Sequence, residues 1–350
     1  MRTRLVAMAV EAHGDRGAAD GLDATVRSSE DLRRALARWW PSASAVALVR
    51  RLLTSPTALR RSAAGVLDTD EQARLLRSAA ARLEAERWTV GEAVVVDEAV
   101  AQVDGVPPTY GHIVADEAQD LSAMALRALA RRCPSGSMTI LGNLAQATEP
   151  GAVTSWEGAR AHLGTGAPVR REDLTVGYRV PAAVMDLANR LLPRVAPGLA
   201  PARSVRAEGR PPERRATTAE GLVPTTVAAA ADLAEEWASV GVIVPPAGGL
   251  DDEVAAALAD AGIEVGRGSR AVTGAVVSLV APAEAKGLEF DGVVVVEPAA
   301  FAPSGDGADR DHAGGGDEDG AAGRLLYIAL TRAVQELVVV HHRDLPVELA

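Results

Sequence analysis

Short runs of apolar residues that end in polar turns recur after residue 110 and predict buried strands. Five such runs are Ile113–Ala115, Met138–Leu141, Val240–Val244, Ala275–Leu279 and Val293–Val296. Between them, apolar residues at three-to-four-residue spacing predict helices over 122–132, 225–238 and 251–261. An alternation of strands and helices favours a parallel sheet with helices on its faces, so the fold class expected is α/β.

The first hundred residues carry the helical spacing. Ser28 with Asp31 is a capping-box pattern, and the helix that it opens is expected to end at Pro41. A second helix is expected from Ser44 to Leu53, and a third from Thr69 that carries Leu75, Leu76 and Leu83. Residues 1–100 are therefore predicted to form a mostly helical subdomain.

Two later segments have a loop-like composition. Residues 194–222 are rich in Pro, Arg and Gly, which is typical of a linker or a long loop. Residues 302–323 are rich in Gly and Asp and are expected to be a disordered loop without chemistry. After it, we expect a helix over Leu325–Ala333 and a last strand, Leu337–Val340, that closes the sheet.

The composition argues against three features: a broadly basic nucleic-acid-binding surface, an intrachain disulfide and a membrane helix. The chain has 350 residues, 48% of them hydrophobic, and a net charge of −11, which argues against a broadly basic nucleic-acid coat but leaves a local basic groove open. One cysteine, Cys133, makes an intrachain disulfide impossible and fits a reducing cytoplasm. No run approaches about 18 apolar residues, so no membrane helix is expected.

The first candidate site is the sequence HIVADEAQD, where Asp116 and Glu117 follow an apolar strand. Ligands bind at the carboxyl edge of parallel sheets, and Mg²⁺ prefers oxygen ligands. Asp116 would therefore hold Mg²⁺, and Glu117 would orient or deprotonate an attacking water. A similar segment, VVVDEAV at Val94–Val100, lacks the following Gln and the matching downstream strand.

Further polar residues follow later strands or precede helices. Gln146 follows the second strand and could reach a phosphate oxygen or the attacking water; the alternative is a polar turn. Tyr178 beside Arg179 suits a base-stacking face and a phosphate-charge neutraliser, and the alternative is a packed Tyr with a surface Arg. Gly287 and Glu289 lie in a tight loop before a buried strand.

Five short motifs, DEAQD, GNLAQ, GYR, KGLEF and YIALTRA, occur in this order. Together they resemble motifs II to VI of superfamily 1 helicases of the UvrD/Rep type. Within that group the chain looks most similar to the actinobacterial HelD/HelR branch, whose members are ATPases that recycle RNA polymerase. The carrying segments include RRCPSGSMTILGNLAQ and LTVGYRVPAAVMDLANRLLP.

The resemblance implies RecA-like domains and a role for each motif residue. Asp116 would sit at Mg²⁺, Glu117 would be the catalytic base, and Gln146 would sense the γ-phosphate of ATP. Tyr178 would stack on adenine, Arg179 and Arg332 would be arginine fingers, and Glu289 would contact the ribose beside Gly287. Residues 101–172 would be the C-terminal part of the first RecA-like domain, with 1–100 as its insert, and 173–350 would be the second.

Two departures from the family pattern stand out. Asn143 replaces the usual Asp of motif III, and GxxxxGK[ST], the phosphate-binding P-loop, is absent; Lys286 is the only lysine in the chain. The resemblance therefore implies the C-terminal half of a family protein, with an N-terminal half that carries the P-loop missing. We expect little or no ATPase activity from this chain alone.

The sequence leaves three alternatives for the binding partner. RNA polymerase is expected by resemblance, whereas a UvrD-type enzyme would bind and unwind DNA. The aromatic content is 3%, and Trp156 is the one good candidate for a nucleic-acid contact near motif III, although it could simply pack. A remnant that binds polymerase or nucleic acid without hydrolysing ATP is the third alternative.

Overall fold

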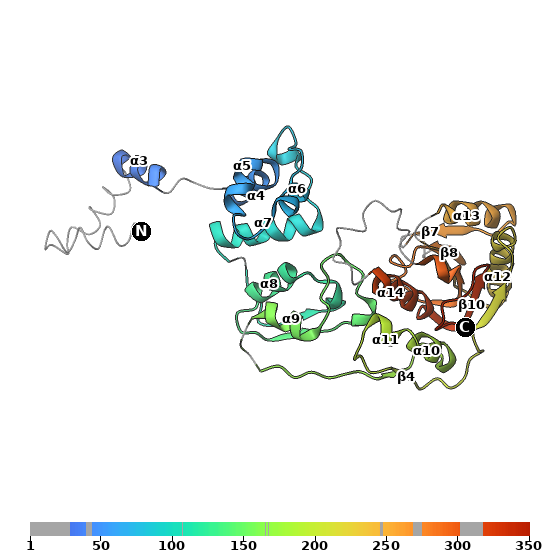
Figure 1. The fold of residues 1–350 in the computed structure, drawn as a ribbon. Coiled ribbons are helices and arrows are strands. Elements are labelled where there is room, and N and C mark those ends of the chain that lie inside the picture. The colour runs from blue at the N-terminus through green and yellow to red at the C-terminus, as the bar shows by residue number, and fades with distance from the viewer. Residues whose placement is uncertain are drawn as a thin grey trace. The chain divides into compact units, whose positions relative to one another are not determined.

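The chain divides into two compact units, Met1–Pro108 and Thr109–Ala350, in a computed structural model (Figure 1). The structure describes residues 29–39, 44–106, 108–164, 166, 168–245, 248–268, 275–301 and 318–350. Each unit is built from a different kind of element. Among the described residues, no helix combines the length and the apolar character needed to cross a membrane.

Helices make up the first unit over its described residues. They are α3 (Glu30–Trp39), α4 (Ala45–Thr54), α5 (Pro56–Ser62), α6 (Thr69–Leu75), the short 3-10 helix η2 (Leu83–Ala85) and α7 (Val90–Val103). Ser44 caps α4, and capping boxes at Asp68 and Thr89 open α6 and α7. Side-chain oxygens at these positions accept the backbone N–H groups that the first helical turn leaves free.

One sequence expectation changes in this unit. The helix that begins at Thr69 ends at Leu75, because the backbone at Leu76 is extended. Leu83, which was expected in the same helix, lies in η2. The segment Val94–Val100, which was not assigned to the site, lies inside α7. Ser28, the expected cap of the first helix, lies outside the described residues.

A small parallel sheet begins the second unit. Its strands are β1 (Ile113–Ala115) and β2 (Met138–Ile140), with Ile113 opposite Met138. Between them runs α8 (Ala123–Arg132), capped by Ser122, and α9 (Trp156–Leu163) packs against α8 through an apolar cluster around Leu126. This strand–helix–strand unit matches the expected positions to within one residue.

The main sheet has six strands in the order β5-β10-β9-β6-β8-β7, and every neighbouring pair is parallel. The strands are β5 (Glu213–Ala216), β6 (Val240–Ile243), β7 (Val265–Arg267), β8 (Val277–Val280), β9 (Phe290–Val296) and β10 (Ala333–His341). Central strands β6, β8 and β9 are valine-rich and buried, as expected for a sheet covered on both faces. The predicted α/β class is confirmed.

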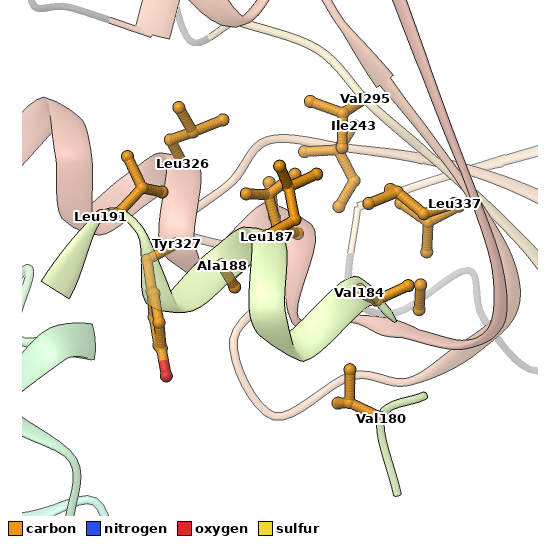
Figure 2. Packing of buried hydrophobic residues seen from close by; sticks show 14 of the residues in the cluster. Val180, Val184, Leu187, Ala188, Leu191, Ile243, Val295, Leu326, Tyr327 and Leu337 are labelled. Atoms are coloured by element: carbon orange, nitrogen blue, oxygen red, sulfur yellow. The ribbon is translucent and has the colours of Figure 1, made fainter. Parts of the chain in front are cut away.

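Alternate residues of these strands enter two separate cores. Ile243, Val295 and Leu337 pack with α10 (Ala182–Asn189), the short α11 (Leu192–Val195) and α14 (Glu318–Leu330) (Figure 2). Their neighbours of opposite parity, such as Val242 and Val296, pack instead with α12 (Leu222–Glu236) and α13 (Leu250–Asp260). Successive side chains of each strand therefore point to opposite faces of the sheet.

The loop expectations need correction. Residues 194–222 are not a simple linker, because they contain β4 (Arg203–Ser204), which pairs with β3 (Val176–Gly177), and the edge strand β5. Of the expected loop 302–323, residues 302–317 lie outside the described residues, and 318–323 form the start of α14. Strand β10 does not close the sheet, since it lies between β5 and β9.

Candidate functional site

The carboxylate pair Asp116 and Glu117 lies in an exposed turn directly after β1. Glu117 has φ 51°, a left-handed conformation that is uncommon outside glycine, and its N–H donates to Asp116 Oδ1 at 2.8 Å. Gln119, fully buried, donates from Nε2 to Glu117 Oε2 at 2.7 Å. The turn thus presents two acid groups at the strand end and fixes the direction of one of them.

A second polar loop follows β2. The N–H of Asn143 donates to Gln119 Oε1 at 2.9 Å, which ties this loop to the carboxylate turn. Ala145 is fully buried in the apolar cluster that contains Tyr327 of α14, and Gln146 beside it is half-buried. Sequence reasoning expected Gln146 at a strand end, and the structure places it in the short 3-10 helix η4 (Leu144–Gln146), three residues past Asn143.

The loop before β9 holds the third group. Gly287 has φ 75°, so a residue with a side chain would be strained there. Glu289, two residues on, forms an ion pair with Arg179, with Oε1 and Nη1 2.8 Å apart. Both side chains are about half exposed, at 42% and 52%, so this pair is free to exchange partners.

Arg332 is the buried charge of the site, only 8% exposed. The expected helix over Leu325–Ala333 is shorter: α14 ends at Leu330, Thr331 and Arg332 form a turn, and Ala333 begins β10. Arg332 donates from Nε to the Ile328 carbonyl and from Nη1 to the Leu288 carbonyl, both at 3.1 Å. Backbone carbonyls, and not a carboxylate partner, therefore fix the orientation of this guanidinium.

Electrostatics connect Arg332 to the other groups. Burial lowers the pKa of Arg332, whereas the charges of Glu117 and Glu289 raise it and that of Arg179 lowers it again. These four side chains come from segments up to 215 residues apart in the sequence (332 − 117). The structure therefore brings the proposed base, both proposed arginine fingers and the proposed ribose contact within electrostatic reach of one another.

Tyr178 and Trp156 differ in their surroundings. Tyr178 is 73% exposed, next to Arg179, so its ring faces are available. Trp156 is partly buried and packs against the cluster of Leu126, Val153 and Ala159. The alternative that Trp156 simply packs has this direct support.

Sequence reasoning assigned no role to several residues that organise the site. Lys286 donates to both carboxylate oxygens of Asp120, Gln119 links Glu117 to Asn143, and buried Tyr327 shares a hydrogen bond with Asn143. Burial raises the pKa of Tyr327, and the bond with Asn143 opposes that shift. The one usable signal was that Lys286 is the single lysine of the chain.

The residues present suit a nucleotide phosphate with Mg²⁺ better than an all-protein metal site. The described residues contain no group of three metal-binding side chains. Mg²⁺ typically takes one or two carboxylates and completes its shell with phosphate oxygens and water. Exposed Asp116 could provide such a carboxylate, and half-exposed Arg179 and buried Arg332 could provide positive charge for phosphate oxygens.

The chain matches no known protein family's sequence profile. No curated protein matches it either. Among solved structures, it is similar to the C-terminal domain of a possible DNA helicase from Lactobacillus plantarum, at 24% identity and a TM-score of 0.35, over 50% of this chain and 92% of that one. This TM-score is too low to support a function, and the roles inferred from the site and its motifs do not depend on it.

Proposed function

We propose that this chain is the C-terminal half of an ATP-dependent motor of the superfamily 1 helicase type. The observation that carries the proposal is that Glu117, at the end of β1, lies within electrostatic reach of Arg332, which Glu289 and its partner Arg179 also influence. Phosphoryl transfer to water needs a group that orients the water and fixed positive charge at the phosphate oxygens. This cluster supplies both.

Each residue has a definite task in that reaction. The Glu117 carboxylate accepts a proton from the attacking water, and Gln119 fixes the carboxylate through its 2.7 Å hydrogen bond. Arg179 and Arg332 donate to phosphate oxygens; three of the five donors of Arg332 are used in bonds to the protein. Gln146 reports the state of the terminal phosphate.

The remaining residues hold the nucleotide. The Tyr178 ring stacks on the adenine, Glu289 accepts a hydrogen bond from the ribose, and Gly287 gives its loop the required turn. Asp116 holds Mg²⁺, which supplies positive charge to the phosphates when bound. Arg179 and Glu289 pair with each other before ATP binds, and this half-exposed pair separates when the nucleotide takes its place.

We also propose that the motor acts on RNA polymerase, with a second polypeptide segment contributing the P-loop. Support for polymerase comes from the motif resemblance alone. If the chain instead belongs to a DNA-unwinding enzyme, we expect it to bind single-stranded DNA with an affinity that falls as the salt concentration rises. Retention of purified RNA polymerase by the immobilised chain, compared with retention of single-stranded DNA, separates these partners.

Nucleotide binding is the direct test. We expect the chain to bind a fluorescent ATP analogue in the presence of Mg²⁺. Tyr178→Ala should weaken binding about tenfold, since base–aromatic stacking is worth roughly 1–3 kcal/mol. Arg160→Ala changes an exposed arginine of α9 and serves as the matched control.

Turnover separates the motor from a binding remnant. We expect little ATP hydrolysis by the chain alone and turnover when a polypeptide with GxxxxGK[ST] is added, abolished by Glu117→Gln. Failure of both samples to bind ATP would overturn the proposal. Polymerase binding that survives Glu117→Gln without any nucleotide binding would favour the non-hydrolysing alternative.

A further inference from the structure

A single lysine connects the two sides of the proposed nucleotide site. Lys286 Nζ lies 2.8 and 2.7 Å from the two carboxylate oxygens of Asp120 and 2.8 Å from Thr148 Oγ1. A lysine ammonium has three donors, so these acceptors use all of them. Its side chain is 13% exposed and that of Asp120 is 17% exposed, so this pair is more constrained than an ordinary surface ion pair.

From Asp120 the contacts continue to the proposed base. Gln119 Nε2 lies 3.4 Å from Asp120 Oδ2 and 2.7 Å from Glu117 Oε2. Gln119 has little freedom, because a Cβ at Gly142 would meet its Oε1 at 2.4 Å and that oxygen accepts the N–H of Asn143. A displacement of Asp120 is therefore passed to Glu117 through one buried side chain.

In the other direction, Lys286 lies in the loop that anchors both arginines. The carbonyl of Leu288 accepts from Arg332, and Glu289 pairs with Arg179. Lys286 is two and three residues from these anchors, with Gly287 forming the turn between them. Fixing the ammonium therefore also fixes the loop on which both guanidinium groups depend.

The residue type is informative. The chain contains 36 lysines and arginines, and 35 of them (36 − 1) are arginine. An ammonium directs its three donors tetrahedrally from one atom, whereas the guanidinium of arginine is a planar fork. Three acceptors that converge on one point at 2.7–2.8 Å suit lysine and not arginine.

We propose that Lys286 is a positioning residue that holds the Glu117 turn and the arginine-anchoring loop in one arrangement for nucleotide binding. It touches neither ATP nor the attacking water and acts through Asp120. This inference rests on the proposed function. It predicts that Lys286 and Asp120 contribute to nucleotide affinity as one unit.

The test measures binding of a fluorescent ATP analogue with Mg²⁺ to the full chain. We expect Lys286→Ala and Asp120→Asn each to weaken binding at least fivefold, and the double variant to bind within twofold of Lys286→Ala. Lys286→Arg should restore part of the loss. Arg267→Ala removes an ion pair with Asp251 and Asp252 elsewhere in the unit and should change affinity less than twofold.

Selective ¹⁵N-lysine labelling gives a readout that a general loss of stability does not imitate, because it reports on Lys286 alone. The analogue and Mg²⁺ should shift the Lys286 amide resonance in the natural sequence, and much less after Gln119→Ala. Unchanged affinity of Lys286→Ala and Asp120→Asn, beside normal binding by the natural sequence, overturns this inference and leaves the proposed function intact. No binding by the natural sequence, with or without the P-loop polypeptide, overturns both.

Discussion

Arg332 shows how a single residue can hold charge in a buried position. Its guanidinium is satisfied mainly by backbone carbonyls, so the charge needs no adjacent carboxylate and remains available to a phosphate. Removing the side chain would leave the Leu288 carbonyl without this donor, whereas the Ile328 carbonyl keeps its hydrogen bond from Thr331 Oγ1. Unsatisfied buried groups cost about 1–3 kcal/mol each.

We therefore expect Arg332→Ala to lower the free energy of unfolding by about 1–3 kcal/mol, because the Leu288 carbonyl loses its charged donor. Urea unfolding followed by circular dichroism measures this change. The exposed Arg160→Ala serves as a control and should stay within about 0.5 kcal/mol of the natural sequence. Equal stability of the two variants would show that the Leu288 carbonyl finds another partner.

At the scale of elements, the packing of β6 on β9 depends on one glycine. A Cβ at Gly241 would meet the Phe290 ring at 2.4 Å, and Phe290 is 1% exposed with no room to move. Overpacking of this kind costs about 1–3 kcal/mol. Gly241→Ala should reduce the free energy of unfolding by that amount, whereas Gly177→Ala, where nothing lies within 4 Å, should not.

The helical unit contains a buried acid that makes it sensitive to pH. Glu86, whose side chain is 1% exposed, accepts hydrogen bonds from Arg77 and Arg50, and the bond from Arg77 is the main reason that the pKa of Glu86 is lowered. A carboxylate with a lowered pKa stabilises the fold above its unfolded pKa, about 4.3, and this contribution is lost as the pH falls through the folded value.

Glu86→Gln should therefore make the stability of this unit less dependent on pH below about 4.3. Thermal unfolding between pH 7 and pH 3 provides the measurement. Glu84→Gln changes an exposed glutamate two residues away and should leave the pH dependence as it is. If Glu86→Gln and Glu84→Gln lose stability equally as the pH falls, a carboxylate other than Glu86 causes the acid sensitivity.

The same elements show what sequence could and could not predict. Apolar runs located β1, β2, β6, β8 and β9, since buried parallel strands are continuous in apolar residues. Strand β5 (Glu213–Ala216, ERRA) was missed because an edge strand can be polar. The motifs identified most of the proposed site residues, but the bridge from Lys286 to Asp120 spans 166 residues and leaves no local pattern.

At the scale of the whole molecule, one face of the β1–β2 sheet is exposed among the residues that the structure describes. On one face of this sheet, Val114 is 66% exposed and Leu141, just after β2, is 38% exposed. On the opposite face, Ile113 and Ile140 are partly covered. Parallel sheets are normally covered on both faces. We therefore expect the proposed P-loop polypeptide to pack on this open face.

Val114→Glu tests that expectation. The side chain is exposed, so the free energy of unfolding of the chain should change by less than about 0.5 kcal/mol. Burial of an unpaired carboxylate under a bound partner costs free energy. We therefore expect the P-loop polypeptide to bind Val114→Glu at least tenfold more weakly, which corresponds to a loss of about 1.4 kcal/mol of binding free energy. Val347→Glu places the same charge at another exposed valine, 83% exposed, and should bind normally. If both variants support full ATP turnover in the mixture, the partner covers another surface.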